Sequence, residues 1–217
     1  KRMGRNYNDR AWRNLRAIFQ GMEAEAMIQI FQTEDGVVHQ KDERLPGSWI
    51  ALTNPTATEI LEISDAYQID PDHLRAPLDE EERSRIEVED TYTLVLVDIP
   101  AIEERSGKDW YVTIPLGIIM TADLLITVCL EESPVLSVFM DGRVRDFHTF
   151  MKTRFILQIL YKNASLYLQY LRIIDKKSEV IERKLHQSQK NQELIELLEL
   201  EKSLVYFTTS LRSNEVV

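Results

Sequence analysis

The sequence contains few of the residues on which common catalytic and binding sites depend. A single cysteine, Cys129, excludes an internal disulfide, and its apolar surroundings indicate a core residue. The seven glycines form neither a GxGxxG motif nor a phosphate loop, so nothing supports nucleotide binding through the usual backbone cradles. The histidines lack the spacing of a zinc site and do not stand beside a nucleophile elbow. We therefore expect a protein that is not an enzyme, with its histidines at the surface or at helix edges: His39, His73, His148 and His186.

Long apolar runs and excess positive charge are also absent. No window reaches the roughly 18 apolar residues of a membrane-spanning helix, because Pro115, Asp123 or a lysine interrupts the longest candidates. The formal net charge of -10 argues against a nucleic-acid partner, whose electrostatic footprint is a basic face. With 44% hydrophobic and 29% charged residues, the composition is that of an ordinary globular chain. Cations or basic partners suit this charge better than nucleic acid does.

The two ends of the sequence differ from its middle. Residues 1–26 are basic and polar, and the letters FQG before Met22 resemble the remnant of a protease site. We interpret residues 1–26 as a tag remnant or a disordered extension, with a native start at Met22 or Met27, and with an RNA- or lipid-binding arm as the alternative. The final letters SNEVV carry no Gly or Pro stop signal, which predicts that the last helix continues beyond Val217.

Up to about residue 140 the pattern predicts an α/β domain. Short runs rich in Val, Ile, Thr and aromatic residues predict strands, whereas Ile60, Ile63 and Tyr67 recur at helical spacing behind a threonine cap. An aspartate-proline pair begins a second short helix. Alternating strands and helices indicate a mixed β-sheet flanked by helices over residues 27–140. The expected strands are 27–31, 37–39, 47–54, 91–100, 110–121 and 124–131, and the expected helices are 56–69 and 71–74.

The period changes in the second part of the chain. From Leu157, apolar and small residues follow in steps of three and four, which is the a/d pattern of a coiled-coil seam. Phe150 to Gln187 taken as one helix is about 57 Å long. A polar turn and a second apolar repeat predict a long antiparallel helical hairpin, or stalk, over residues 141–217. The seam residues are Leu160, Ala164, Tyr167, Leu171, Ile174, Ser178, Ile181 and Leu185, and those of the second helix are Leu197, Leu204 and Leu211.

Carboxylates are concentrated between Asp79 and Asp90, where seven acidic residues share twelve positions with two arginines. Glu81 stands four residues before Arg85, an arrangement that stabilises a helix. Asp79 and Arg83 have the same spacing. The other carboxylates are hard oxygen donors that suit Mg²⁺ or Ca²⁺, although the glycine of a calcium loop is absent. On the residues alone, the run is either the solvated start of a helix or a weak cation contact.

The block IDPDHLRAPLDEEERSRIEVEDTYTLVLVDIP, with the α/β domain before it and the two long helices after it, resembles the CorA-type divalent-cation transporters. That family has a His-Pro-Leu-x-x-Glu-Asp helix, then an Arg-x-Lys-x-Glu stretch and a strand that begins with Tyr. Here Asp70-Pro71 stands at the place of the His-Pro pair. The likeness covers residues 27–217, and the positions that match the stretch and the strand are Arg83, Arg85, Glu87 and Tyr92.

The resemblance implies the cytoplasmic regulatory and stalk domain of a CorA-like transporter of Mg²⁺, Co²⁺ or Ni²⁺, on the cytoplasmic side of the cell inner membrane. Such proteins are homopentamers whose α/β/α domains form a funnel, and their stalk helix leads into transmembrane helices, here expected beyond Val217. They gate a passive cation flow in response to intracellular Mg²⁺. Three alternatives stay open: a zinc-transporting relative, a soluble coiled-coil oligomerisation module, and a small α/β hydrolase-like enzyme.

The sensing residues of the family match this sequence poorly. The family's Glu-Asp pair falls on Arg75 and Ala76, so a cation and a methyl group replace the expected ligands. The nearest carboxylates follow about one helical turn later. The resemblance implies Mg²⁺ as a regulatory ion at a subunit interface, and no other cofactor. The candidate metal ligands are Asp79, Glu80, Glu81 and Glu82.

Overall fold

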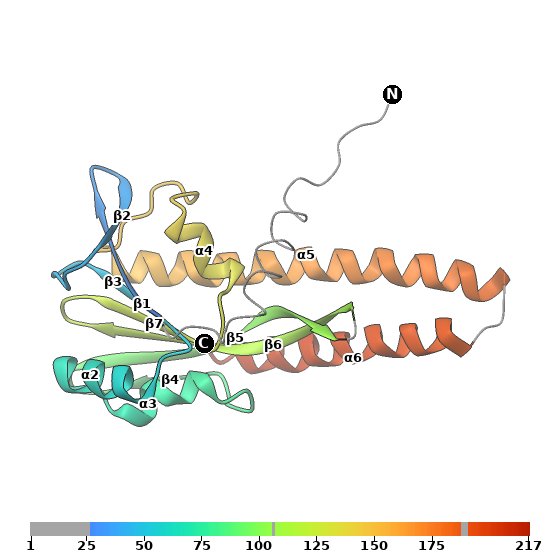
Figure 1. Cartoon of the computed structure of the whole chain (residues 1–217), viewed down its shortest axis with the longest axis horizontal. Helices are drawn as coiled ribbons and strands as arrows, with labels where there is room; N and C mark the ends of the chain where they lie inside the picture. Colours follow the sequence, from blue (N-terminus) through green and yellow to red (C-terminus); the bar gives the residue numbers. More distant parts are fainter. Residues whose placement is uncertain (1–26, 106, 188–190) are drawn as a thin grey trace.

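The computed structural model describes residues 27–105, 107–187 and 191–217 of the chain. The interpretation of residues 1–26 lies outside these ranges, and so does part of the predicted turn between the long helices. In the described ranges, helices lie on both faces of one β-sheet (Figure 1). The two long helices run antiparallel and extend past the end of the sheet (Figure 1).

One seven-stranded mixed sheet forms the middle layer, in the order β2-β1-β3-β7-β6-β5-β4. Neighbouring strands are antiparallel except β3 and β7, which are parallel. β2 and β4 lie at the two edges, so each pairs on one side only. The strands are β1 (Met27–Glu34), β2 (Val37–Lys41), β3 (Trp49–Thr53), β4 (Arg85–Val88), β5 (Tyr92–Arg105), β6 (Lys108–Thr121) and β7 (Leu125–Cys129).

The β5–β6 hairpin is the longest part of the sheet. Its two 14-residue strands pair in one continuous register, from Tyr92 opposite Thr121 to Arg105 opposite Lys108. β4 pairs with β5 only as far as Leu96, so the next stretch of β5 has an open edge. The strands predicted over 91–100 and 110–121 are confirmed within these longer strands, except that β5 begins at Tyr92.

Helices cover the sheet on both sides, and their starts follow local signals. α2 begins at a capping box in which Thr56 and Glu59 exchange hydrogen bonds, as its threonine cap predicted. α3 begins at Asp70, whose side chain accepts a hydrogen bond from the backbone N–H of Asp72 at 2.8 Å, and has Pro71 in its first turn. The helices are α2 (Ala57–Tyr67), α3 (Pro71–Arg75), the 3-10 helix η1 (Ala76–Leu78), α4 (Pro134–Met140), α5 (Lys152–Gln187) and α6 (Asn191–Asn214).

The two faces of the sheet support separate cores. α2, α3 and η1 pack on one face, and α4 with the start of α5 packs on the other. The second core is aromatic: Trp49 lies 5.0 Å from Phe155 between ring centroids and meets Phe139 and Phe147 edge to face. Cys129 belongs to this core, as predicted, and burial raises the pKa of its thiol to about 12.

α5 buries the predicted seam only from Tyr167 onwards. There Tyr167 and Ile174 are buried in a cluster shared with α6. Before Tyr167, the buried residues are instead Phe155, Ile159 and Asn163, whereas Leu157 is 62% exposed. The predicted seam is wrong in this part because the helix packs on α4 and the sheet, whose surface does not follow a heptad.

α6 also buries a stripe other than its heptad leucines. Leu204 and Leu211 are 41% and 39% exposed. Phe207 is buried instead, with its ring edge to face against Tyr167 of α5 at 5.1 Å between centroids. The buried Ser210 donates to the hydroxyl of Thr113 on β6 at 2.8 Å. The apolar repeat thus predicted the helix but not the face that packs against the sheet.

The predicted fold class is confirmed. The chain has a mixed sheet flanked by helices, followed by a long antiparallel helical hairpin (Figure 1). The hairpin is packed on the sheet through part of its length, since Tyr111 of β6 shares a cluster with α5 and α6. The division into domains at 27–140 and 141–217 stays a prediction.

Candidate functional site between α3 and the β4–β5 hairpin

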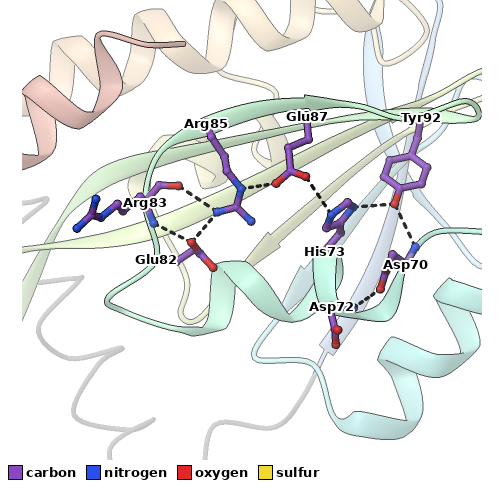
Figure 2. A network of polar contacts seen from close by, with 8 residues as sticks. All are labelled: Asp70, Asp72, His73, Glu82, Arg83, Arg85, Glu87 and Tyr92. Atoms are coloured by element: carbon purple, nitrogen blue, oxygen red, sulfur yellow. Dashed lines mark hydrogen bonds and ion pairs between the residues drawn. The ribbon is translucent and has the colours of Figure 1, made fainter.

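The candidate site lies where α3 meets the β4–β5 hairpin at one edge of the sheet (Figure 2). The start of α3 is held by the hairpin, because the hydroxyl oxygen of Tyr92 accepts a hydrogen bond from the backbone N–H of Asp70 at 3.2 Å. The turn of the hairpin is closed by the backbone N–H of Glu89, which donates to the carbonyl of Tyr92 at 2.9 Å. Tyr92 therefore links the start of α3 to the β4–β5 hairpin by a hydrogen bond.

His73 projects from α3 towards the hairpin, and its side chain is only 16% exposed. Its Nδ1 lies 2.7 Å from the hydroxyl of Tyr92, and its Nε2 lies 3.3 Å from Oε2 of Glu87. The rings of His73 and Tyr92 meet edge to face, with centroids 5.8 Å apart. Both ring nitrogens therefore have a polar partner, and the imidazole is held in one orientation between helix and hairpin.

Arg85 joins two carboxylates on the strand side of the site. Its Nε donates to Oε1 of Glu87, and its Nη1 lies 2.5 Å from Oε1 of Glu82 (Figure 2). The hydrogen bond from Arg85 holds the pKa of Glu87 below its ordinary value. Glu87 is therefore ionised at neutral pH, with one oxygen on Arg85 and the other facing His73.

The phenol of Tyr92 remains neutral at the centre of this network. Burial raises the pKa of Tyr92, and the negative charges of Glu89 and Asp70 raise it further. A neutral phenol can accept a hydrogen bond and also donate one. Tyr92 can therefore serve Asp70 and His73 at the same time.

The acidic run forms a turn and not the predicted start of a helix. Oδ1 of Asp79 accepts a hydrogen bond from the backbone N–H of Glu81 at 3.0 Å, and residues 79–84 contain no helix. The helical spacing of Glu81 and Arg85 predicted the wrong element because Arg85 begins β4 and pairs with β5. The same correction applies to Arg83, which was expected one turn of helix after Asp79.

The four predicted metal ligands all lie on this turn. Asp79, Glu80 and Glu81 are exposed, and Glu82 is half-buried on Arg85. Their role as ligands stays a prediction. Across the described ranges, a different set brings three ligand atoms within 4.8 Å of one another, and its members are His73, Glu87 and Glu89.

The two residues at the family's sensing positions supply no ligand oxygen from their side chains. Arg75 is exposed and pairs with Asp72 at 2.9 Å. Ala76 is buried at the start of η1, against the sheet. Neither side chain therefore offers an oxygen to a cation, and the match of these two positions to the family's sensing pair stays a prediction.

Sequence reasoning missed the set of His73, Glu87 and Glu89. Glu87 and Glu89 follow His73 by 14 and 16 residues in the chain, and the packing of the helix on the hairpin brings the three together. Glu87 lies on β4, whereas Glu89 lies in the turn that follows it, so no strand or helix spacing in the sequence links the three residues.

Comparison with known proteins places the chain in a family. The family model described as "CorA-like Mg2+ transporter protein" matches residues 47–217. The chain belongs to the CorA-like Mg²⁺ transporter family. This family is one of transporters and not of enzymes, and the resemblance inferred from the acidic block and the long helices is confirmed.

The CorA-like chain is similar to the cobalt/magnesium transport protein CorA of Methanocaldococcus jannaschii, with 26% identity over 178 residues. The alignment covers 78% of this chain and 53% of the relative, so the chain spans about half the length of the curated relative it matches. None of the helices in the described part of this chain is long and apolar enough to cross a membrane.

Solved structures agree with this placement. The soluble domain of CorA from Methanocaldococcus jannaschii superposes with a TM-score of 0.75 at 25% identity, over 89% of this chain and 78% of that domain. The ZntB cytoplasmic domain from Vibrio parahaemolyticus shares the fold, with a TM-score of 0.65 at 11% identity over 87% of this chain and 75% of that one. The α/β domain with its long helical hairpin is therefore the fold of the CorA soluble domain.

Proposed function

We propose that this chain is the cytoplasmic regulatory and stalk domain of a CorA-like transporter, and that it gates a passive flow of Mg²⁺, Co²⁺ or Ni²⁺ in response to intracellular cation. One contact carries the regulatory part of this proposal. Ser84, which follows the acidic turn, donates from its backbone N–H to Oγ of Ser213 at 3.1 Å and from its hydroxyl to Oδ1 of Asn214 at 2.7 Å. A cation that displaces the turn thus acts directly on the end of α6.

The regulatory cation in this proposal is Mg²⁺, bound by the exposed carboxylates of Asp79, Glu80 and Glu81 with a weaker contribution from Glu82. Mg²⁺ prefers oxygen ligands and keeps several waters, so one or two carboxylates from each subunit are enough. Glu82 is the weaker candidate because Arg85 already neutralises its charge. A neighbouring subunit would supply the remaining ligands.

The assembly in this proposal is a homopentamer on the cytoplasmic side of the cell inner membrane, attached through membrane helices of the full-length protein. The 53% coverage of the relative leaves room for such helices in a protein of that length. α6 leaves several large apolar side chains exposed, and these offer apolar area for contacts between subunits. Its residues are Leu194, Ile195, Leu198, Leu204, Val205, Tyr206 and Leu211.

The test is the thermal stability of the chain in Mg²⁺, against NaCl of matched ionic strength. A ligand that binds only the folded state stabilises it, by about 2.7 kcal/mol at a hundred times its Kd. We expect Tm to rise with Mg²⁺ in the parent and in a control variant with the same charge change elsewhere, Asp42→Asn/Glu43→Gln/Glu104→Gln. The rise should disappear in Asp79→Asn/Glu80→Gln/Glu81→Gln. A parent Tm indifferent to Mg²⁺ on the order of tens of millimolar contradicts the regulatory role.

A second candidate function is a soluble oligomerisation module, favoured by the same exposed apolar side chains of α6. Light scattering with and without Mg²⁺ separates the two. A module oligomerises to the same extent in both conditions, whereas subunits bridged by Mg²⁺ associate more strongly when the cation is present. A role in zinc transport rests on the fold shared with the ZntB domain alone, so the same titration should include Zn²⁺.

A further inference from the structure

We propose that His73, Glu87 and Glu89 form a binding site for a divalent transition-metal ion of the class of Zn²⁺, Co²⁺ and Ni²⁺, within one copy of the chain. The site differs from the acidic turn of Asp79 to Glu82 in its position and in the chemistry of its donors. It goes beyond the proposed function, because it requires neither Mg²⁺ sensing nor a neighbouring subunit.

The distances suit a single small ion. Ligand atoms about 2.1 Å from a tetrahedral Zn²⁺ lie about 3.4 Å from one another. Nε2 of His73 and Oε2 of Glu87 are already 3.3 Å apart. The carboxylate of Glu89 completes a group of three donors within 4.8 Å. Glu89 is exposed, so its side chain can rotate the remaining distance without disturbing the core.

The first two donors are held in place by neighbours that leave the ligand atoms available. Tyr92 engages Nδ1 of His73, so Nε2 is the nitrogen that faces the site. Arg85 engages Oε1 of Glu87, so Oε2 faces the imidazole. Metal-binding histidines commonly use the second ring nitrogen in such a hydrogen bond, which fixes the ring and strengthens the ligand.

The donor set determines which ion would bind. Imidazole is a ligand for Zn²⁺, Co²⁺ and Ni²⁺, whereas Mg²⁺ requires near-octahedral oxygen coordination and gives up water reluctantly. One imidazole and two carboxylates leave at least one position for water. The charge is also favourable: Glu87 and Glu89 contribute two negative charges, and the single positive charge of Arg85 is shared with Glu82.

A bound ion would join α3 to the β4–β5 hairpin. His73 comes from the helix, Glu87 comes from β4, and Glu89 comes from the turn of the hairpin. Without an ion, His73 and Glu87 form a direct polar contact, with Glu89 in solvent. The experiment must therefore distinguish a metal site from this contact alone.

The test is calorimetric titration of the metal-free chain with ZnCl₂, repeated with CoCl₂ while the visible absorption of bound Co²⁺ is recorded. We expect one ion per chain, with affinity reduced about tenfold or more in His73→Gln and in Glu89→Gln. Loss of the supporting hydrogen bond in Tyr92→Phe should weaken binding by about 10 to 100-fold. The matched controls His39→Gln and Glu104→Gln make the same changes outside the site, and they should bind like the parent.

Thermal unfolding of each metal-free variant verifies that it folds. Equal Zn²⁺ affinity in the parent and in His73→Gln overturns the proposal. So does a loss of affinity in the two control variants that is as large as the loss in the site variants. The Mg²⁺ response of the acidic turn is independent, because His73→Gln leaves Asp79, Glu80 and Glu81 in place. Failure of one proposal can therefore be recognised without failure of the other.

Discussion

Replacing Gly117 by alanine should destabilise the protein, because β6 and η1 approach each other too closely for a side chain. A Cβ at Gly117 would lie 2.3 Å from Cγ of Pro77 and 3.2 Å from its Cβ. Strand alternation places Gly117 on the same face of the sheet as Ile119, under α2, α3 and η1. η1 connects the helix that carries His73 to the acidic turn, so this contact also positions both candidate sites.

The expected size of the effect combines two opposing terms. Overpacking a filled core by a methyl group costs about 1–3 kcal/mol. Alanine in a strand interior is favoured over glycine by about 0.5–1 kcal/mol. A net loss of about 1–2 kcal/mol should remain for Gly117→Ala. In a Pro77→Ala background, Cγ and Cδ are gone and only the 3.2 Å contact persists, so the same substitution should cost close to nothing or stabilise slightly.

The assay is urea unfolding of the four proteins in this cycle: the parent, Gly117→Ala, Pro77→Ala and the double variant. The midpoint concentrations give the change in unfolding free energy, and equal m-values show that the unfolded reference is unchanged. The contact predicts a coupling energy between the two positions of about 1 kcal/mol or more. If Gly117→Ala costs the same in both backgrounds, the close approach of η1 to β6 is not the reason for the glycine.

Two further predictions concern the open edge of β5. Asn214→Ala should lower the unfolding free energy by about 1–3 kcal/mol, because Asp98 and Ser84 each lose a hydrogen-bond partner. In urea unfolding, the control Glu215→Ala, at the exposed neighbouring residue, should leave this free energy nearly unchanged. An equal loss in both variants contradicts the role of Asn214. Asp98→Asn should stabilise the protein at neutral pH. Burial raises the pKa of Asp98, so the folded state loses stability as pH rises from the ordinary pKa of an aspartate through the raised one. The difference in Tm between Asp98→Asn and the parent should therefore shrink on acidification, and a variant less stable than the parent at neutral pH refutes this.

Local signals correctly predicted the helices whose starting residues form hydrogen bonds with near neighbours in the chain. The cap at Thr56 and the pair Asp70-Pro71 specify helix starts within a few residues, and both starts are where the sequence placed them. Signals that depend on distant partners misled. Arg85 has helical spacing from Glu81, but the backbone there is set by pairing with Leu96 of β5, eleven residues later and beyond the reach of the i,i+4 spacing.

The same distinction explains the candidate site. The predicted ligands Asp79 to Glu82 are neighbours in the chain, and the structure leaves them on one exposed turn. The closer cluster of His73, Glu87 and Glu89 exists only because α3 docks on a hairpin formed later in the chain. A composition rich in carboxylates indicated the region, whereas the ligand geometry required the tertiary contact made by Tyr92.

The open edge of β5 shows how the long helices are attached to the sheet. β4 stops pairing at Leu96, so Asp98, which pairs with β6 on its other side, would lack a strand partner at the open edge. Asn214 at the end of α6 replaces that strand: its Oδ1 accepts from the N–H of Asp98 and its Nδ2 donates to the carbonyl, both at 2.8 Å. A carboxamide is suited to this position because it carries both a donor and an acceptor, as a peptide group does.

α5 is attached to the sheet at the same residue of β5, Asp98. Asn163 and Tyr167 also donate to the carbonyl of Asp98, at 3.0 and 3.2 Å. Both long helices are therefore oriented by one residue of β5, and β4, which carries Glu87, pairs with the same strand a few residues earlier. A displacement of the β4–β5 hairpin by a bound cation has a short route to the helices, because one continuous strand connects the two. If that route operates, substituting Asn214 should uncouple α6 from the turn while leaving cation affinity at the turn itself intact.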